Sequence, residues 1–548
     1  MNWTIHTYHI LQSLSTTCQI TCQTQPRPTT SQPHRNHIAT TSAFCRYHNV
    51  QDRWTNNISY SQLVASSCIS ILQLWWHPYI HDLKRLLPFV LLYNVFSVLL
   101  GYPLLYLELA IGAVTKQSAL KCWDMAPIGR GIGISMLLSC AITALSLGAV
   151  CAWCMALLVH SAHVFLPWLH CAAVSAPCAA RHRPLPPGAD TPAQSFVLNF
   201  VLYLKRDGLR GGLGSIVPEL TVYHVISWLL IYLVACKRIY SYSKMVLFKD
   251  VLAFFIVTCC CVGVFRLKGA GRMFAEFRWS VLFDSFQFWR EALEFSLVQL
   301  SLSQGTLIML GAMAPRQPLG RPAALTFLAS KLVCTGAALV LGAAHGALYY
   351  DYDAEPNVMK GAASSLVLWA DLSARVGGSQ FWAALIFLTL FTLTVSHTAL
   401  LVQTLMSALT GSGVRHIRWA LLVLLCAMFC FTGIMTLCTQ GGIYVVDLLW
   451  WSTRARPLLS AAAATLVPRA FCEHVYDATG DHPPPAVRAA WVLAPPVLLL
   501  FFISGMWSDK AGAAGWSLVG VSLLPGAAFA LLYLVFKCRV RNIVSEEK

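Results

Sequence analysis

Charged residues are scarce in this chain, and their scarcity excludes a soluble fold. Only 11% of the 548 residues are Asp, Glu, Lys or Arg, whereas 57% are hydrophobic. A soluble domain of this length could not bury so much apolar surface in one core. Runs of the roughly 20 apolar residues that a spanning helix needs recur from Ser61 to Lys537. The composition predicts an all-α integral membrane protein of about twelve transmembrane helices.

Motifs of enzymes are also lacking. The sequence has no metal cluster with ligand spacing, no nucleophile elbow and no phosphate-binding loop, so we expect no catalytic residue. A formal net charge of +16 raises the question of nucleic acid. However, Lys and Arg lie mostly at the ends of the apolar runs, as they do in membrane proteins. We therefore expect a lipid bilayer and no nucleic acid among the partners.

Acidic residues are missing from the amino-terminal segment, where none precedes Asp52. Its Ser, Thr, Gln, His and Pro cannot build a packed core. We expect residues 1–55 to be a disordered cytoplasmic tail, residues 56–540 to be the twelve-helix domain, and residues 541–548 to be a short cytoplasmic tail. The absence of acids is also typical of a transit peptide, but Arg is too infrequent here to favour that alternative.

Basic residues mark the cytoplasmic loops. By hydropathy we place spans near residues 61–80, 87–111, 132–166, 220–236, 246–266, 287–314, 322–350, 381–410, 418–437, 441–467, 489–507 and 515–537. Lys and Arg gather after the fourth, sixth, eighth and twelfth spans, whereas the loop from Tyr350 to Ser379 is acidic. The positive-inside rule places both termini in the cytoplasm. We expect a multi-pass protein of the plasma membrane.

Cysteine is rare outside the apolar runs. Most of the 20 Cys lie within predicted spans, where thiols pack as small hydrophobes. Cys171 and Cys178 lie in the loop after the third span and are the candidate pair for a disulfide.

Several motifs carry a resemblance to a known family. The segment Thr439 to Leu449 reads TQGGIYVVDLL and looks like that family's T-x-G-G-x-Y run between spans nine and ten. Further matches occur in the family's order: GYPLLYLELAIG from Gly101, LPW from Leu166 with a following Cys171, KRIYSYSKMVLF from Lys237 and HPPPAVRAAWVLAPPVLLLF from His482. Between about Trp54 and Lys537 the chain thus resembles the neurotransmitter:sodium symporters, also called solute carrier family six.

The resemblance implies a LeuT-type fold with two inverted five-helix repeats, in which helices 1 and 6 are discontinuous. Unwound backbone is tolerated at membrane depth where it lines a polar cavity and can hold ions. The first span is polar from Ser66 to Gln73, and the sixth is polar from Gln299 to Gly305. Hydrogen bonding between helices could also explain these residues. Their occurrence in both halves favours two breaks at a binding site.

The resemblance also implies two sodium sites. The sodium ligands carried over from the family are Ser66, Cys68, Ile69, Gln73, Gln299, Ser330, Leu393, Ser396 and His397. Ser66, Cys68, Ile69 and Leu393 would contribute backbone oxygens, which survive side-chain changes. At His397 a neutral imidazole could accept, whereas a protonated ring would repel the ion. His397 could be a proton-linked substitute for sodium, a sign of a lost site, or a packing residue.

Substrate and chloride positions depart further from the family pattern. The substrate-contacting positions would be Cys68, Ser70, Leu147, Val298, Gln299 and Gln304. Ser70 replaces the Asp of amine carriers, so a small zwitterion fits better, and Leu147 replaces a Tyr that would bind a carboxylate. The chloride ligands would be Tyr106, Gln299, Ser330 and Cys334. Phe295 replaces an expected Gln, which speaks against chloride coupling.

The outer gate and the intramembrane acid complete the comparison. Trp76 and Trp450 stand where the family has an Arg and an acid, so the charged gate has lost both members together. The pair could gate by aromatic contact, or the two Trp could belong to interface belts. Glu108 matches an intramembrane Glu and is expected to cap or brace a broken helix.

Two functions fit these residues. The first is a sodium-coupled secondary active transporter, a symporter of a small amino acid or neurotransmitter-like solute that works by alternating access. The second is a transport-silent or proton-coupled relative that acts as a membrane partner or regulator. The altered side chains at both sodium sites suggest the second.

Overall fold

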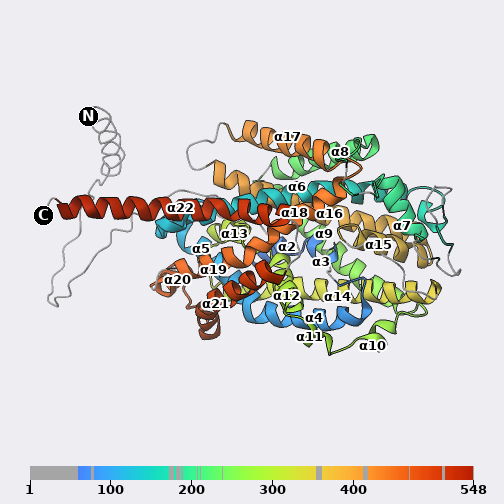
Figure 1. Cartoon of the computed structure of the whole chain (residues 1–548), viewed down its shortest axis with the longest axis horizontal. Helices are drawn as coiled ribbons and strands as arrows, with labels where there is room; N and C mark the ends of the chain where they lie inside the picture. Colours follow the sequence, from blue (N-terminus) through green and yellow to red (C-terminus); the bar gives the residue numbers. More distant parts are fainter. Residues whose placement is uncertain are drawn as a thin grey trace. The chain divides into compact units, whose positions relative to one another are not determined.

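The computed structural model describes residues 60–75, 79–171, 178–180, 186, 189–206, 208–209, 211–236, 238–352, 361–410, 417–467, 470–508 and 513–546. Chain contacts separate residues 1–49 from residues 50–548, and all described residues belong to the second unit. Within the described residues the regular structure is helical and no strand forms, apart from two isolated bridges (Figure 1). The expected all-α membrane fold is confirmed.

The helices follow the predicted order of spans. In chain order they are α2 (Tyr60–Cys68) with α3 (Ile71–Trp75), α4 (Leu83–Phe96) with η1 (Ser97–Gly101) and α5 (Tyr102–Thr115), α6 (Arg130–His160), α8 (Pro218–Cys236), α9 (Arg238–Val264), α12 (Phe286–Gln299) with α13 (Thr306–Ala312), α14 (Gly320–Tyr352), α16 (Ser379–Leu409), α17 (Arg418–Thr436), α18 (Gly442–Trp450) with η6 (Trp451–Ala455) and α19 (Arg456–Leu466), α21 (Pro485–Ser508) and α22 (Ala513–Glu546). Shorter helices in the connections are η2 (Lys121–Met125), η3 (Pro127–Gly129), η4 (Pro167–Leu169), α7 (Pro192–Phe196), η5 (Val197–Val201), α10 (Arg272–Glu276), α11 (Val281–Asp284), α15 (Ser364–Arg375) and α20 (Phe471–Thr479).

Length and hydropathy support the membrane assignment. In the described part of the chain, 8 helical stretches are each long and apolar enough to cross a bilayer. Spans one, five, six and ten are not among them. Spans one, six and ten each consist of helical pieces shorter than the ~20 residues that a continuous span needs, whereas span five is the continuous helix α9 of 27 residues. Large apolar side chains stay exposed on α8, α17, α21 and α22, for example Leu229, Phe431, Leu500 and Leu532. These helices present the surface that a bilayer would cover.

The first and sixth spans are interrupted. The helix of span one stops at Cys68 and resumes at Ile71. The helix of span six stops at Gln299 and resumes at Thr306. In the second interruption Ser301, Ser303 and Gly305 have positive φ angles of 54°, 60° and 76°, which an α-helix cannot accommodate. The expectation that helices 1 and 6 are discontinuous is confirmed.

Both interruptions lie inside the helix bundle. The helix α2 packs against α14 and α9, and α3 packs against α14 and α16. The helix α13 packs against α5 and α16. Ser70 and Gln299 have fully buried side chains. The backbone groups that the breaks release therefore face protein and not lipid, as membrane depth requires.

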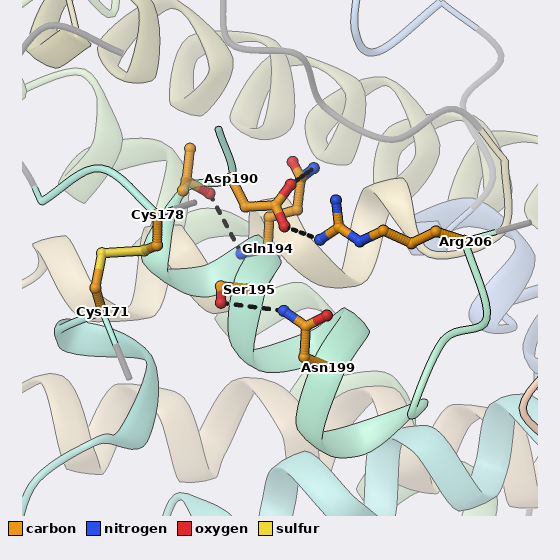
Figure 2. The surroundings of a disulfide bond; sticks show 8 residues. Cys171, Cys178, Asp190, Gln194, Ser195, Asn199 and Arg206 are labelled. Atoms are coloured by element: carbon orange, nitrogen blue, oxygen red, sulfur yellow. Dashed lines mark hydrogen bonds and ion pairs between the residues drawn. A yellow bond between two sulfur atoms is a disulfide. The ribbon is translucent and has the colours of Figure 1, made fainter. Parts of the chain in front are cut away.

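Two connecting segments are held by specific contacts. In the loop after α6, Cys171 and Cys178 form the expected disulfide, and Asp190 pairs with Arg206 and accepts a hydrogen bond from Gln194 (Figure 2). The residues between α17 and α18 hydrogen bond to the residues just before α8. Val217 N donates to Cys438 O at 2.8 Å, and Gly441 N donates to Leu213 O at 2.9 Å.

The helix α15 packs against α3, the second helical piece of span one. Trp369 donates from Nε1 to the carbonyl oxygen of Leu74 at 2.9 Å, and Ser365 donates to the carbonyl oxygen of Trp75. The amino-terminal end of α15 is held by Asp447 of α18, whose carboxylate accepts from Ala362 N at 2.8 Å. The loop helix, span one and span ten are thus linked on this side of the bundle.

Candidate cation and substrate sites

The side chain of Gln73 joins the two interruptions. Its Nε2 donates to Cys68 O at 2.5 Å, to Gln299 O at 2.8 Å and to Ser330 Oγ at 3.2 Å. Its Oε1 accepts from Ser70 N at 2.8 Å, and because a backbone N–H can only donate, this contact fixes which end of the amide is oxygen. The structure therefore brings together Cys68, Gln73, Gln299 and Ser330, the residues expected at the first sodium site. The amide nitrogen stands where their oxygens converge.

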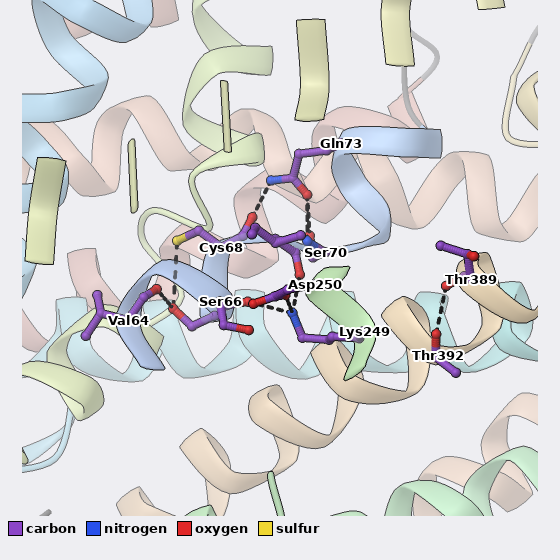
Figure 3. Close-up of polar contacts among 11 residues, drawn as sticks. Val64, Ser66, Cys68, Ser70, Gln73, Lys249, Asp250, Thr389 and Thr392 are labelled. Carbon is purple, nitrogen blue, oxygen red and sulfur yellow. Dashed lines mark hydrogen bonds and ion pairs between the residues drawn. The ribbon is translucent and has the colours of Figure 1, made fainter. Parts of the chain in front are cut away.

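Further expected sodium ligands lie at the break of span one and on α16, where Leu393, Ser396 and His397 are the residues expected at the second sodium site. The carbonyl oxygens of Ser66 and Ile69 both accept hydrogen bonds from the side chain of Lys249 (Figure 3). Leu393, Ser396 and His397 are buried on α16. Among the described residues the side chains of Ser396 and His397 have no hydrogen-bond partner. The helix α16, which carries His397, packs against α9, which carries Lys249.

The expected chloride ligands are only partly brought together. Gln299 donates from Nε2 to Cys334 Sγ at 2.5 Å, next to Ser330 on the same helix. Tyr106 lies elsewhere, with its ring packed 6.2 Å from that of Trp491. Tyr93 is the tyrosine beside this group, because Lys331 lies 4.7 Å from its ring centroid and also hydrogen bonds weakly to Gln299. Chloride binding stays a prediction.

The expected substrate positions border a buried arginine. Arg456 is fully buried at the start of α19, and it donates to Val298 O and to Thr143 Oγ1, both at 3.3 Å. Thr143 lies one helical turn before Leu147, so both face the same side of α6. Gln304 also donates to Thr143, at 3.0 Å. The remaining positions, Cys68 and Ser70, lie at the break in span one.

Glu108 braces the break in span six, as the sequence predicts. Its Oε1 accepts from Ser303 N at 2.7 Å. The hydroxyl of Ser303 is 2.6 Å from that of Ser460 and 3.3 Å from Arg456 O, so spans two, six and ten meet at this residue. Ser303 has a positive φ angle, and its buried backbone N–H thereby obtains a hydrogen-bond acceptor inside the bundle.

The predicted gate pair can be placed only in part. Trp76 lies outside the described residues, whereas Trp450 is buried at the end of α18. The neighbouring Trp75 stacks on Trp153 of α6, with ring centroids 5.8 Å apart. The carbonyl oxygen of Trp75 also accepts the hydrogen bond from Ser365 of α15. A gate formed by Trp76 and Trp450 stays a prediction.

The buried cations Lys249, Lys331 and Arg456 were missed by the predictions from sequence. Lys249, Lys331 and Arg456 have relative exposures of 1%, 9% and 0%. The signal that could have found them is the cost of a charge inside a predicted span, which makes such residues functional candidates. All three fall within the spans predicted from hydropathy, although none of them is at a position carried over from the family pattern.

Comparisons with known proteins agree with this architecture. The sequence profile described as "Sodium:neurotransmitter symporter family" matches residues 51–516. A similar curated protein is the "Sodium- and chloride-dependent glycine transporter 2" of Xenopus laevis, which is 22% identical over 501 residues. The aligned region covers 82% of this chain and 63% of that protein, so the chain spans less than two thirds of the length of this relative.

Proposed function

Because the chain belongs to the sodium:neurotransmitter symporter family, a family of multi-pass membrane transporters with the LeuT-type fold, we propose that it carries a small amino-acid-like solute across the plasma membrane by alternating access. Both termini would be cytoplasmic, and a single sodium ion at the first site would drive transport. The observation that carries this proposal is the convergence of Cys68 O, Gln299 O and Ser330 Oγ between the two breaks.

Oxygens from three helices are the type of site that holds a sodium ion in broken-helix transporters. The side chain of Gln73 is one methylene longer than Asn, and its amide nitrogen now occupies the point where these oxygens meet. A change of rotamer would withdraw the nitrogen and leave the backbone oxygens in place, because the breaks are held by other contacts, such as that of Glu108 with Ser303. Movement of the bound sodium ion down its gradient would supply the driving force for uptake of the solute.

Arg456 favours a solute that carries a carboxylate. Its Nε has no hydrogen-bond partner among the described residues, although the side chain is fully buried. A guanidinium binds a carboxylate through two parallel hydrogen bonds, and this geometry is the strongest available to an arginine. Since Arg456 contacts Thr143 one turn from Leu147, it would replace the hydroxyl that the Leu removes. An amine without an acid would find no counter-ion at Ser70.

The test is uptake by the purified chain in proteoliposomes. Radiolabelled glycine, alanine, proline, leucine and γ-aminobutyrate would be offered with an inward sodium gradient and, in parallel, with choline in place of sodium. We expect accumulation of at least one carboxylate-bearing solute above protein-free liposomes, and we expect choline to abolish it. Equal uptake in sodium and choline would contradict sodium coupling. No uptake of any solute by correctly folded protein would contradict the carrier.

A second candidate is a transport-silent relative that serves as a membrane partner. The observation in its favour is the amide nitrogen of Gln73, which already satisfies the oxygens that would otherwise bind the ion. If Gln73 never leaves this position, the breaks are permanently closed. The chain would then show neither sodium binding nor uptake, while remaining folded in the bilayer.

A further inference from the structure

Lys249 reaches from α9 into the break of span one. Its Nζ lies 2.8 Å from Ser66 O, 2.8 Å from Ile69 O and 2.7 Å from Asp250 Oδ1 (Figure 3). The side chain is 1% exposed, so water does not compete for these contacts. Ser66 and Ile69 are two of the residues whose backbone oxygens the family resemblance assigns to sodium. The ammonium group of Lys249 binds both of these oxygens.

The hydrogen bonds of this ammonium are complete. A lysine ammonium has three N–H donors and no acceptor. Its three donors are matched by three acceptors, namely the two carbonyl oxygens and the carboxylate of Asp250. No donor remains for Ser396 or His397 on α16, in agreement with their lack of partners in the described part of the chain. The ammonium thus holds the α2 half of the site and leaves the α16 half unused.

Electrostatics explain why a cation is held at this place. The carbonyl groups at the carboxyl-terminal end of a helix have no partner within the helix and carry the negative end of its dipole. The end of α2 lies at Cys68, between the two carbonyls that Lys249 binds. Burial of an unpaired charge is costly, but a neighbouring carboxylate and two aligned carbonyls offset that cost. The two carbonyl oxygens and the carboxylate of Asp250 favour one positive charge, and the ammonium of Lys249 supplies it.

We propose that the ammonium of Lys249 is a tethered cation that takes the place of sodium at the second site. The positive charge that binds the carbonyl oxygens of span one belongs to the side chain of Lys249 on α9. It is covalently attached, so it neither binds from solution nor dissociates. Sodium is excluded there, because the carbonyl oxygens of Ser66 and Ile69 cannot serve two cations at once. The proposal concerns ion binding and does not depend on whether the chain transports a solute.

The test counts sodium ions bound per chain. Radioactive sodium would be titrated onto the purified protein in nanodiscs, at constant ionic strength with choline chloride. The double variant Lys249→Met/His397→Ser removes the ammonium and restores a hydroxyl on α16, while Met keeps the length of the side chain. We expect this variant to bind one additional sodium ion per chain relative to the unchanged protein. Lys116→Met is the matched control, since it removes another lysine that donates to a backbone carbonyl, that of Ala314.

Two results would overturn the proposal. One is a second sodium ion bound to the unchanged protein. The other is a folded, monodisperse double variant that gains no sodium. If the double variant does not fold, a cryo-EM map of the unchanged protein in sodium chloride decides. Continuous density from α9 to the carbonyls of Ser66 and Ile69 supports the tethered cation, whereas a retracted lysine and a separate ion peak refute it.

Discussion

The carboxylate of Glu108 accepts a hydrogen bond from the backbone nitrogen of Ser303 at 2.7 Å. A residue of span two thereby stabilises the unwound part of span six. Ser303 has a φ angle of 60°, so its N–H points away from any helical partner and needs an acceptor from elsewhere.

Loss of this acceptor should destabilise the protein. Glu108→Leu would leave the N–H of Ser303 buried and unsatisfied, at a cost of about 1–3 kcal/mol. Glu108→Gln keeps a carbonyl oxygen at the same distance along the side chain and should cost less. Melting temperatures of the detergent-purified variants, followed by size-exclusion chromatography with fluorescence detection, would measure the difference. If Gln is as damaging as Leu, the charge of Glu108 matters and not its role as acceptor.

Gln73→Asn should improve sodium binding at the first site. The shorter side chain withdraws its amide nitrogen from Cys68 O and Gln299 O, and the freed oxygens can then coordinate an ion. A tenfold tighter dissociation constant would add up to about 1.4 kcal/mol of stabilisation at saturating sodium. The measurement is the rise in melting temperature when sodium chloride replaces choline chloride.

Gln194→Asn serves as the control for this shortening, because Gln194 lies on α7 and donates to Asp190, not to a residue of either break. Its melting temperature should not become more sensitive to sodium. If Gln73→Asn behaves in the same way, Gln73 does not block an otherwise usable site.

Arg456→Gln should weaken transport of carboxylate-bearing solutes. The variant keeps one hydrogen-bond donor but loses the charge and the paired N–H groups, so we expect KM to rise at least tenfold, equivalent to about 1.4 kcal/mol. Arg456→Lys should retain part of the affinity. Arg130→Gln, which removes an exposed arginine paired with Asp124, should leave uptake unchanged. An unaltered KM in Arg456→Gln would show that the arginine does not contact the solute.

The disulfide between Cys171 and Cys178 should stabilise the folded protein by a modest amount. The two residues are separated by 7 positions, and the loss of unfolded-chain entropy on closing so short a loop corresponds to about 2 kcal/mol of folding free energy. Cys171→Ser should lower the thermal stability and the amount of protein at the cell surface. Cys472→Ser, which replaces a half-buried free cysteine, is the matched control. Equal surface expression of the two variants would contradict a stabilising role.

The fold could be predicted from sequence to a large extent, whereas the binding sites could not. Apolar runs gave the order of the spans, and the polar stretches at Ser66 and Gln299 indicated where the helices break. The positions of Cys171, Cys178 and Glu108 were also anticipated correctly. These predictions rest on local patterns, such as hydropathy and the cost of buried polar groups, that a single sequence displays.

The contents of the sites depend on side chains that come from distant spans. Lys249 lies 180 positions from Ile69, to which it donates, and no local pattern indicates that the two meet. The family pattern predicted sodium at the carbonyl oxygens of Ser66 and Ile69, but it offered no sign that a lysine side chain binds them. In the same way Tyr106 matched a motif, while Tyr93 is the residue that lies beside Gln299 and Lys331. Long-range packing decides such contacts.

The partners of span one recognise its main chain more than its side chains. Lys249 and the two residues of α15, Ser365 and Trp369, all donate to peptide oxygens of this span. Every amino acid has the same backbone carbonyl oxygen, so side chains along span one can be substituted without loss of these contacts to the neighbouring helices. Most of the residues in this segment can therefore change during evolution, and the bound cation with them, while the packing of the bundle is kept.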